Sequence, residues 1–203
     1  MSKYNFEFIK NEDTPIMCVF GCLLSEEGKK IKKEMLEWIT SKYDCICVNQ
    51  EYPGTLYEWP ALKFAQKYSI DNNIPVLYVH TKGAFNSKNV YLQNKVRELW
   101  KDEFINNYNF YEKAILDNKK IVAGPFIADV PFGVTWLNGF MATPDAWKTV
   151  DLSVPRKSRY EYEFLFRGKD VNPISRVLSG VNKNGHFNDN KEFRMMVDYI
   201  NSL

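Results

Sequence analysis

The sequence predicts an α/β fold in which a mostly parallel, Rossmann-type sheet is flanked by helices. The first part of the chain alternates short apolar runs with longer amphipathic stretches, in the order strand, helix, strand, helix, strand. The third run, residues 75–80, is almost wholly apolar, which is typical of a strand buried on both faces of a parallel sheet. Open parallel sheets bind ligands beyond the carboxyl ends of their strands, so the segments that follow the three strands are of most interest.

Each element of this first part has a local reason. Residues 15–24 are predicted to form a strand, because an apolar run too short for a helix is bounded by proline and glycine. Residues 25–42 begin with a serine N-cap and two glutamates and then carry apolar side chains at helical spacing. Residues 44–48 are the second predicted strand. Residues 58–69 are the second predicted helix, with Pro60 in its first turn, where proline is tolerated.

The second part of the chain is less regular. Thr143 and Pro144 mark a clear helix start, with threonine as the N-cap and proline at the first position. Residues 169–189 are rich in Asn and Gly and are predicted to be a loop. The remaining predicted elements are helices at 90–106, 110–118, 158–166 and 190–203, strands at 120–123 and 134–142, and a loop at 129–133.

Length and composition favour a single domain. The chain has 203 residues, of which 15% are aromatic, enough for one core with rings left to stack on sugars or bases. With 27 Lys+Arg against 25 Asp+Glu, the formal net charge is +2, which argues against a surface dominated by polyanion binding. The N-terminus has no apolar signal segment, and no apolar run reaches the ~20 residues of a membrane span. We therefore expect a cytoplasmic location.

Four cysteines lie in or beside the first two predicted strands: Cys18, Cys22, Cys45 and Cys47. Their spacings, Cys-x3-Cys and Cys-x-Cys, fit a zinc site poorly. We expect buried strand cysteines, and a zinc site is the alternative.

The most informative stretch follows the third strand, where His80-Thr81-Lys82-Gly83 ends a buried apolar run. Lys82 is a point charge suited to a phosphate group, and His80 can donate to phosphate or move a proton. Gly83 allows a sharp turn or the close approach of a ligand. The alternative is a polar turn with a surface lysine and a histidine bonded to the backbone.

Three segments in this order resemble a group of small bacterial and viral glycosyltransferase-like proteins. Residues 77–83 (Leu-Tyr-Val-His-Thr-Lys-Gly) resemble the strand-end motif of that group, and residues 133–142 resemble its Gly-Asn-Phe-Trp-Trp type strand. Residues 159–165 (Arg-Tyr-Glu-Tyr-Glu-Phe-Leu) resemble its Arg…Glu helix. The resemblance implies one GT-A-like domain over residues 1–203, with a nucleotide-binding half at about 1–85 and an acceptor-side half at about 86–203. It also implies a UDP-sugar or other nucleotide-sugar donor.

The sequence departs from better-known GT-A enzymes, which carry Asp-x-Asp at this strand end to hold a divalent metal on the donor diphosphate. Here the equivalent place reads His80-Thr81-Lys82. Mg²⁺ and Mn²⁺ prefer oxygen ligands, so this strand end is a poor metal site. We expect no metal there, because Lys82 could neutralise the leaving diphosphate instead. The alternative is Mg²⁺ or Mn²⁺ held by another acid such as Asp129.

Further candidate residues follow from the resemblance and from residue type. Glu163 is the candidate base that takes the proton of the acceptor hydroxyl. His80 and Lys82 are the other candidate catalytic residues and would act on the donor diphosphate. Glu161, two residues from Glu163 on the predicted helix, would point elsewhere. An ordinary solvated glutamate is the alternative for Glu163, and a helix ion pair with Glu163 is the alternative for Arg159. The candidate donor-binding residues are His80, Thr81, Lys82, Gly83, Glu58, Cys22 and Arg159, and the candidate acceptor-binding residues are Asp129, Trp136, Asn138 and Gly139.

Three functions stay open from the sequence. The first is a glycosyltransferase that acts on a hydroxyl of a glycan or a lipid-linked glycan. The second is a phage-type DNA glycosyltransferase in the host cytoplasm that acts on hydroxymethylated or already glycosylated bases, for which the basic clusters at 29–33 and 156–159 are candidate contacts. The third is a protein that binds sugar nucleotides or glycans without turnover, because no pair of acids stands out.

Overall fold

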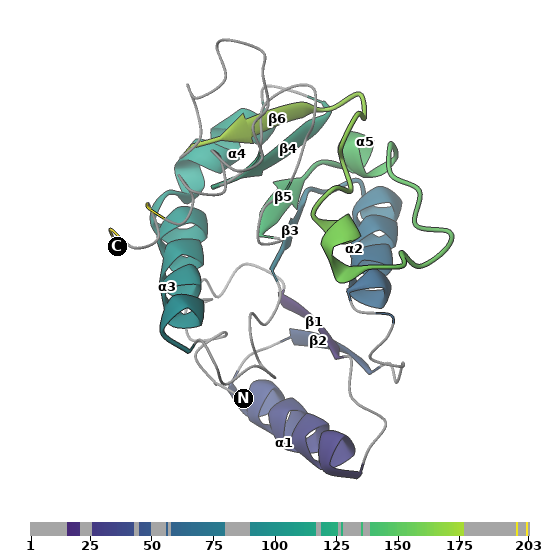
Figure 1. Cartoon of the computed structure of the whole chain (residues 1–203), viewed down its shortest axis with the longest axis vertical. Coiled ribbons are helices and arrows are strands. Elements are labelled where there is room, and N and C mark those ends of the chain that lie inside the picture. Colours follow the sequence, from purple (N-terminus) through teal and green to yellow (C-terminus); the bar gives the residue numbers. More distant parts are fainter. Residues whose placement is uncertain are drawn as a thin grey trace.

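The structure is a computed structural model of the whole chain, in which helices lie on both sides of a small sheet (Figure 1). It describes residues 16–20, 26–42, 45–49, 56, 58–79, 90–116, 119–125, 127, 135, 139–176, 198 and 202.

The first two predicted strands pair as expected. Strand β1 (Ile16–Phe20) runs parallel to β2 (Cys45–Asn49), with Ile16 opposite Cys45 and Cys18 opposite Cys47. Helix α1 (Glu26–Lys42) connects them. A parallel pair needs such a crossover, because its second strand must start at the same end as the first. The predicted strand–helix–strand unit is therefore confirmed.

The second predicted helix forms and runs slightly further than expected. Helix α2 (Trp59–Asn72) carries Pro60 in its first turn and ends at Asn73, whose φ of 54° lies in the left-handed region that commonly terminates helices. The Ser69 hydroxyl donates to the Ile74 carbonyl at 2.6 Å, which ties the helix end to the next strand. Strand β3 (Val76–Tyr78) then begins.

The second sheet is mixed, so the prediction of a mostly parallel sheet is wrong. Its strand order is β3, β5 (Phe140–Ala142), β4 (Ile121–Gly124), β6 (Asn172–Ser175). Strand β5 is antiparallel to both neighbours, whereas β4 and β6 are parallel. Strand direction is decided by pairing between distant segments, and an apolar run reads the same in either direction.

Two other sequence predictions fail in this sheet. Residues 169–189 were expected to be a loop, because residues such as Asn172 and Pro173 are poor strand formers. Strand β6 nevertheless forms within them, since an outer strand of a sheet tolerates such residues. Strand β3 was expected to be buried on both faces, yet Leu77 is 37% exposed, since β3 is the other outer strand of this sheet.

Alternate residues of the central strands enter two separate cores. Val122 and Phe140 join a core with α2, helix α5 (Pro144–Trp147) and the 3-10 turn η6 (Arg159–Tyr162). Ala123 and Met141 join the core on the opposite face, with α3 (Val90–Lys101) and α4 (Tyr108–Leu116). Strand side chains alternate between faces, so helices on both sides bury all four residues of β4 (Figure 1).

The helices of the second part differ from the prediction in their ends. The predicted helix 90–106 is α-helical to Lys101 and continues as a π-turn, η4 (Asp102–Asn106), in which the Asn107 N–H donates to the Asp102 carbonyl at 3.0 Å. The side chains of Asn106 and Asn107 donate to the Asp102 carboxylate, which favours this wider turn. The predicted helix 158–166 is only the 3-10 turn η6 followed by turns. The predicted elements at 129–133 and 190–203 fall outside the described residues, apart from Asp198 and Ser202.

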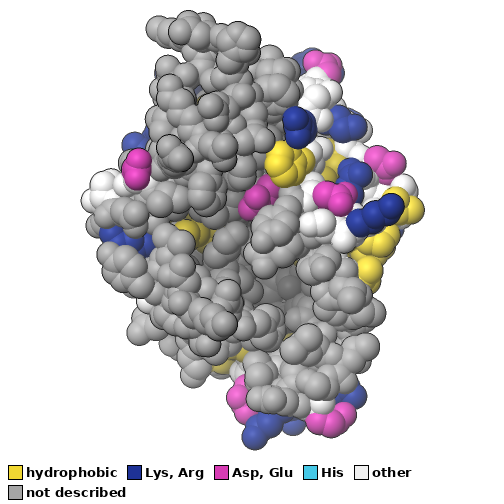
Figure 2. All heavy atoms as spheres, viewed as in Figure 1, with side chains coloured by type: hydrophobic (Ala, Val, Ile, Leu, Met, Phe, Trp, Pro, Cys, Tyr) yellow, Lys and Arg dark blue, Asp and Glu magenta, His cyan; other side chains and the backbone are white. Residues whose placement is uncertain are grey.

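The surface carries both charge signs in close alternation. Figure 2 shows Lys and Arg side chains interspersed with Asp and Glu over the described residues of one face. Lys29 pairs with Glu26 and Lys148 pairs with Asp145, each within one helical turn. Lys32 is buried, unlike its exposed basic neighbours on α1. None of the helices in the described part of the chain is long and apolar enough to cross a membrane.

The start of α5 generates a stability prediction. The buried Thr143 hydroxyl donates to the Lys119 carbonyl at 2.7 Å and accepts from the N–H groups of Ile121, at 3.0 Å, and Ala146, at 3.4 Å. Thr143→Ala leaves these groups without their partner and should lower the free energy of unfolding by about 2 kcal/mol in urea denaturation. Thr143→Ser keeps the hydroxyl and should cost less than half as much. Equal losses for the two variants would show that the methyl group, not the hydroxyl, matters.

Candidate functional site

One edge of the mixed sheet gathers the segments that the sequence singles out. Strands β3, β4 and β6 run in one direction, because β5 is antiparallel to β3 and β4 while β6 is parallel to β4. Their carboxyl ends therefore lie at the same edge. Gly139, the residue immediately before β5, lies at this edge as well. In the chain, the His80-Thr81-Lys82-Gly83 motif follows Val79, the residue after β3.

Several predicted site residues cannot be placed against this edge, because they lie outside the described residues. Their assigned roles stay predictions. They are Cys22, His80, Thr81, Lys82, Gly83, Asp129, Trp136 and Asn138, together with the side chain of Arg159, whose backbone lies in η6.

Glu58 lies at the start of α2, on the same edge. Helix α2 packs against β3 and leads directly into it, so the helix begins where the strand ends (Figure 1). The half-buried Glu58 is the N-cap residue, and its side chain forms no capping hydrogen bond with the helix. Burial raises the pKa of the Tyr162 phenol, and the negative charge of Glu58 adds to this rise. The structure thus brings Glu58 close to the η6 segment, although about a hundred positions separate them in the chain.

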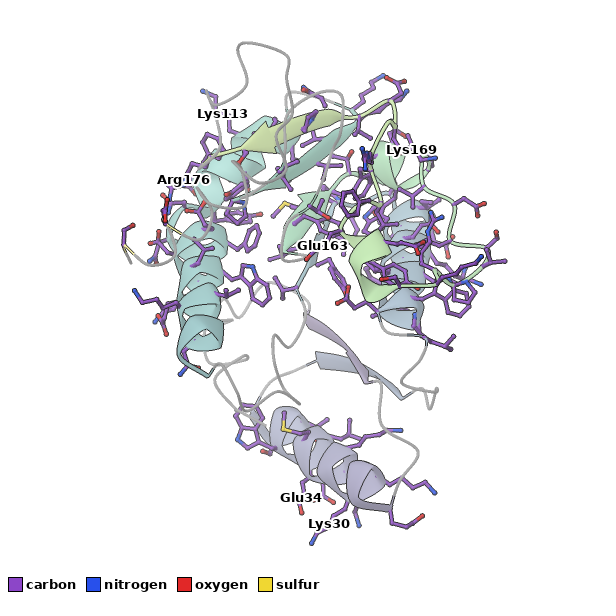
Figure 3. All side chains as sticks on the ribbon, viewed as in Figure 1. Lys30, Glu34, Lys113, Glu163, Lys169 and Arg176 are labelled. Carbon is purple, nitrogen blue, oxygen red and sulfur yellow. The ribbon has the colours of Figure 1, made fainter. Side chains whose placement is uncertain are left out.

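Glu163 follows η6 and is fixed through its backbone. Its carbonyl accepts from the Thr135 N–H at 2.7 Å and from the Thr135 hydroxyl at 3.2 Å. Thr135 is fully buried and lies shortly before Gly139 in the chain. Glu163 is half-buried and Glu161 is exposed, in agreement with the expectation that only one of the two faces inward. Figure 3 shows Glu163 between β5 and η6.

Tyr162 of η6 packs in the same core as α2 and β5. Its ring is fully buried in the core that includes Leu62 of α2 and Phe140 of β5. Its hydroxyl accepts from the Arg156 backbone N–H at 2.9 Å. Glu58, Gly139 and Glu163 are each next to, or within a few residues of, a side chain in this one core. The described candidates are therefore attached to elements that share one core.

The structure gives Gly139 a definite packing role. A Cβ atom at this position would lie 2.3 Å from Nε1 and 2.9 Å from Cδ1 of Trp100. The indole of Trp100 on α3 thus packs directly against the Gly139 backbone. From the sequence, we expected a ligand or another stretch of backbone to approach this glycine. Gly124 repeats this close packing at the end of β4, where a Cβ would lie 2.8 Å from the Gly139 carbonyl oxygen.

Sequence reasoning missed a charged network around a buried carboxylate at this edge. Glu103 of η4 is fully buried, and its carboxylate accepts from the Tyr111 hydroxyl at 2.5 Å. Arg176, immediately after β6, donates to the same carboxylate from Nε, at 3.0 and 2.9 Å, and also from Nη2. Asp102 lies near the same guanidinium, at 3.6 Å from Nη2. In the sequence, Glu103 reads as the solvated face of a helix and Arg176 reads as part of a loop, so no local signal pointed to the pair.

The described residues show no metal centre of their own. No group of three or more His, Cys, Asp or Glu side chains among them is arranged to hold a metal ion.

Comparisons with known protein families, with curated proteins and with solved structures found no match to this chain.

The contact between Gly139 and Trp100 generates a second stability prediction. Gly139→Ala forces a methyl group into a space that the buried indole already fills, and it should lower the free energy of unfolding by about 3 kcal/mol. Gly168→Ala is the matched control, because Gly168 has a φ of 66° and open space around its Cβ position. This control should cost only about 1 kcal/mol of backbone strain. Urea denaturation of the two variants measures both values, and a Gly139→Ala loss no larger than the control would contradict the contact.

Proposed function

We propose that the protein is a glycosyltransferase with a GT-A-like architecture that uses a nucleotide-sugar donor. One observation carries the proposal. Glu58 and Glu163 come from distant segments, yet Glu58 lies close to Tyr162, the residue before Glu163, and Tyr162 shares a core with Tyr78 of β3. In the chain, the His80-Thr81-Lys82-Gly83 motif follows this strand directly after Val79. A histidine and a lysine that directly follow a strand in the chain, together with two carboxylates from other segments, suit a ligand with both a diphosphate and hydroxyl groups.

The proposed reaction needs a proton acceptor and a stabilised leaving group. The acceptor hydroxyl attacks the anomeric carbon of the donor sugar, and the bond from that carbon to the diphosphate oxygen breaks. The hydroxyl proton passes to the Glu163 carboxylate, which serves as general base. The electron pair of the broken bond leaves with the nucleoside diphosphate, whose added negative charge Lys82 and His80 neutralise. Asp129, Trp136, Asn138 and Gly139 are the proposed acceptor side, and Glu58, Thr81, Gly83, Cys22 and Arg159 complete the proposed donor side.

A substrate panel tests this function. The protein is incubated with UDP-glucose, UDP-galactose, UDP-N-acetylglucosamine, GDP-mannose and dTDP-rhamnose, with and without EDTA, and nucleoside diphosphate release is measured. Release that EDTA does not abolish is expected, because Lys82 takes the place of the usual metal. Absence of binding to every nucleotide sugar would overturn the proposal.

The acceptor arms of the panel separate the remaining functions. Release that requires hydroxymethylated or glycosylated DNA would identify the phage-type DNA transferase, and release with a glycan or lipid-linked glycan would identify the first function. Tight donor binding without release, with all these acceptors present, would identify a binding protein without turnover.

Substitution of the proposed base gives a residue-level prediction. Glu163→Gln keeps the shape of the side chain but cannot take a proton, so kcat should fall about 10²- to 10⁴-fold while donor binding is retained. Glu161→Gln is the matched control on the same turn, and it should leave kcat unchanged because Glu161 is exposed. Wild-type turnover in Glu163→Gln would remove Glu163 from the mechanism.

A second residue-level prediction concerns Lys82. Lys82→Ala should lose turnover with the fold intact, as judged by circular dichroism.

A further inference from the structure

The buried network of Glu103, Tyr111 and Arg176 joins three elements at the carboxyl edge of the sheet. Glu103 belongs to η4 and Tyr111 belongs to α4. Arg176, which Figure 3 labels, follows β6. Arg176 grips the Glu103 carboxylate through two nitrogens, a geometry that fixes direction as well as distance. Burial raises the pKa of Tyr111, so its hydroxyl keeps the proton that it donates to Glu103. The position of η4 is therefore set from two sides.

Trp100 lies three residues before Glu103, where α3 runs into η4. Only Lys101 and Asp102 separate the two residues, so the anchored Glu103 limits where the backbone at Trp100 can lie. Trp100 and Tyr111 also pack in the same core. The indole also contacts Gly139, the residue immediately before β5. Arg176 is thus linked to Gly139 through its hydrogen bonds to Glu103, the short stretch of backbone from Glu103 back to Trp100, and the contact of the indole with Gly139.

The end of β6 is tied to the same edge by a second bond. The Ser175 hydroxyl donates to the Pro125 carbonyl at 2.7 Å, immediately beyond the end of β4. Arg176 is therefore held at a fixed place relative to β4. Because Arg176 binds Glu103, the position of η4 is fixed relative to the sheet.

We propose that Glu103, Arg176 and Tyr111 are positioning residues, whose network holds the Trp100 indole against Gly139 and so sets the entry of β5 at the candidate site. The part of this proposal that concerns catalysis rests on the proposed transferase function, since Asn138 and Gly139 are its acceptor side. The structural part stands without it.

The chain supplies a matched control at the opposite edge of the same strand pair. Lys120 precedes β4 and Asp170 precedes β6, and these two exposed side chains form an ion pair. Asp170→Asn removes an ion pair between the same two strands, but on the side away from Gly139. It controls for a general loosening of the β4–β6 pair.

The experiment compares Glu103→Asp, Tyr111→Phe and Asp170→Asn in the full chain. Glu103→Asp keeps the charge and shortens the side chain by one methylene, and Tyr111→Phe removes one hydroxyl. The first readout is the ¹H–¹⁵N resonance of Gly139, which the ring current of the Trp100 indole shifts. This resonance should move in Glu103→Asp and Tyr111→Phe and stay in place in Asp170→Asn. If Glu103→Asp fails to fold, Tyr111→Phe decides the result.

The second readout is the kinetics with the panel sugar that is turned over fastest. Displacement of the β5 entry should lower kcat/KM for the acceptor by up to about 10²-fold, whereas the donor KM should stay near that of the wild type. Folded variants with a lower melting temperature but an unmoved Gly139 resonance would overturn the positioning role. A moved resonance with unchanged acceptor kinetics would overturn its catalytic part. A wild-type protein without nucleoside diphosphate release would overturn the proposed function and the catalytic part together, and the Gly139 resonance would still decide the structural part.

Discussion

The antiparallel insertion of β5 between β3 and β4 is the constraint on which the rest of the structure depends. Phe140, Met141 and Ala142 are all buried; Met141 and Ala142 pair with a strand on each side, and Phe140 pairs with Tyr78 of β3. Because β5 runs against its neighbours, its first residue lies beside the last residues of β3 and β4. The first residue of β5 therefore lies at the same edge as the last residues of β3 and β4. If β5 were parallel to them, its last residue would lie there instead.

This constraint also explains the helices on both faces. A strand paired on both sides sends alternate side chains into opposite faces, so Phe140 and Met141 each need an apolar cover. Helix α2, helix α5 and the η6 turn provide one cover, and α3, η4 and α4 provide the other. The two covers differ in kind at the edge. The first carries Glu58 and Glu163, and the second carries the Trp100 indole that contacts Gly139.

The sequence predicted what is decided locally. The N-cap Thr143 with Pro144 after it, the proline in the first turn of α2, and the β1–α1–β2 unit all form as expected, since each follows from neighbouring residues. What failed depends on distant partners. The direction of β5, the exposure of Leu77 and the strand β6 are set by which segments lie alongside, and an apolar or Asn-rich run carries no mark of its neighbour.

The candidate site divides in the same way. Glu58 and Glu163 could be singled out because each lies in a recognisable segment, next to a helix start and within the Arg-Tyr-Glu-Tyr-Glu run. Glu103 and Arg176 could not, because the partners are 73 positions apart and neither segment looks unusual. The function of Gly139 was also hidden, since a glycine in a strand predicts a close approach without naming what approaches.

Stability alone is a poor account of the Glu103 network. Removal of one partner from a buried ion pair costs about 3–5 kcal/mol, yet replacement of the whole set by well-packed apolar side chains is often neutral or stabilising. What apolar side chains lack is direction, because they pack in many orientations at similar energy, whereas a guanidinium gripped at two nitrogens accepts only one. The three groups here fix η4 at the point where α3 carries Trp100 onto Gly139. A directional bond placed one helical turn from a close backbone contact has its largest effect on the position of that contact, and that contact is the entry to the central strand.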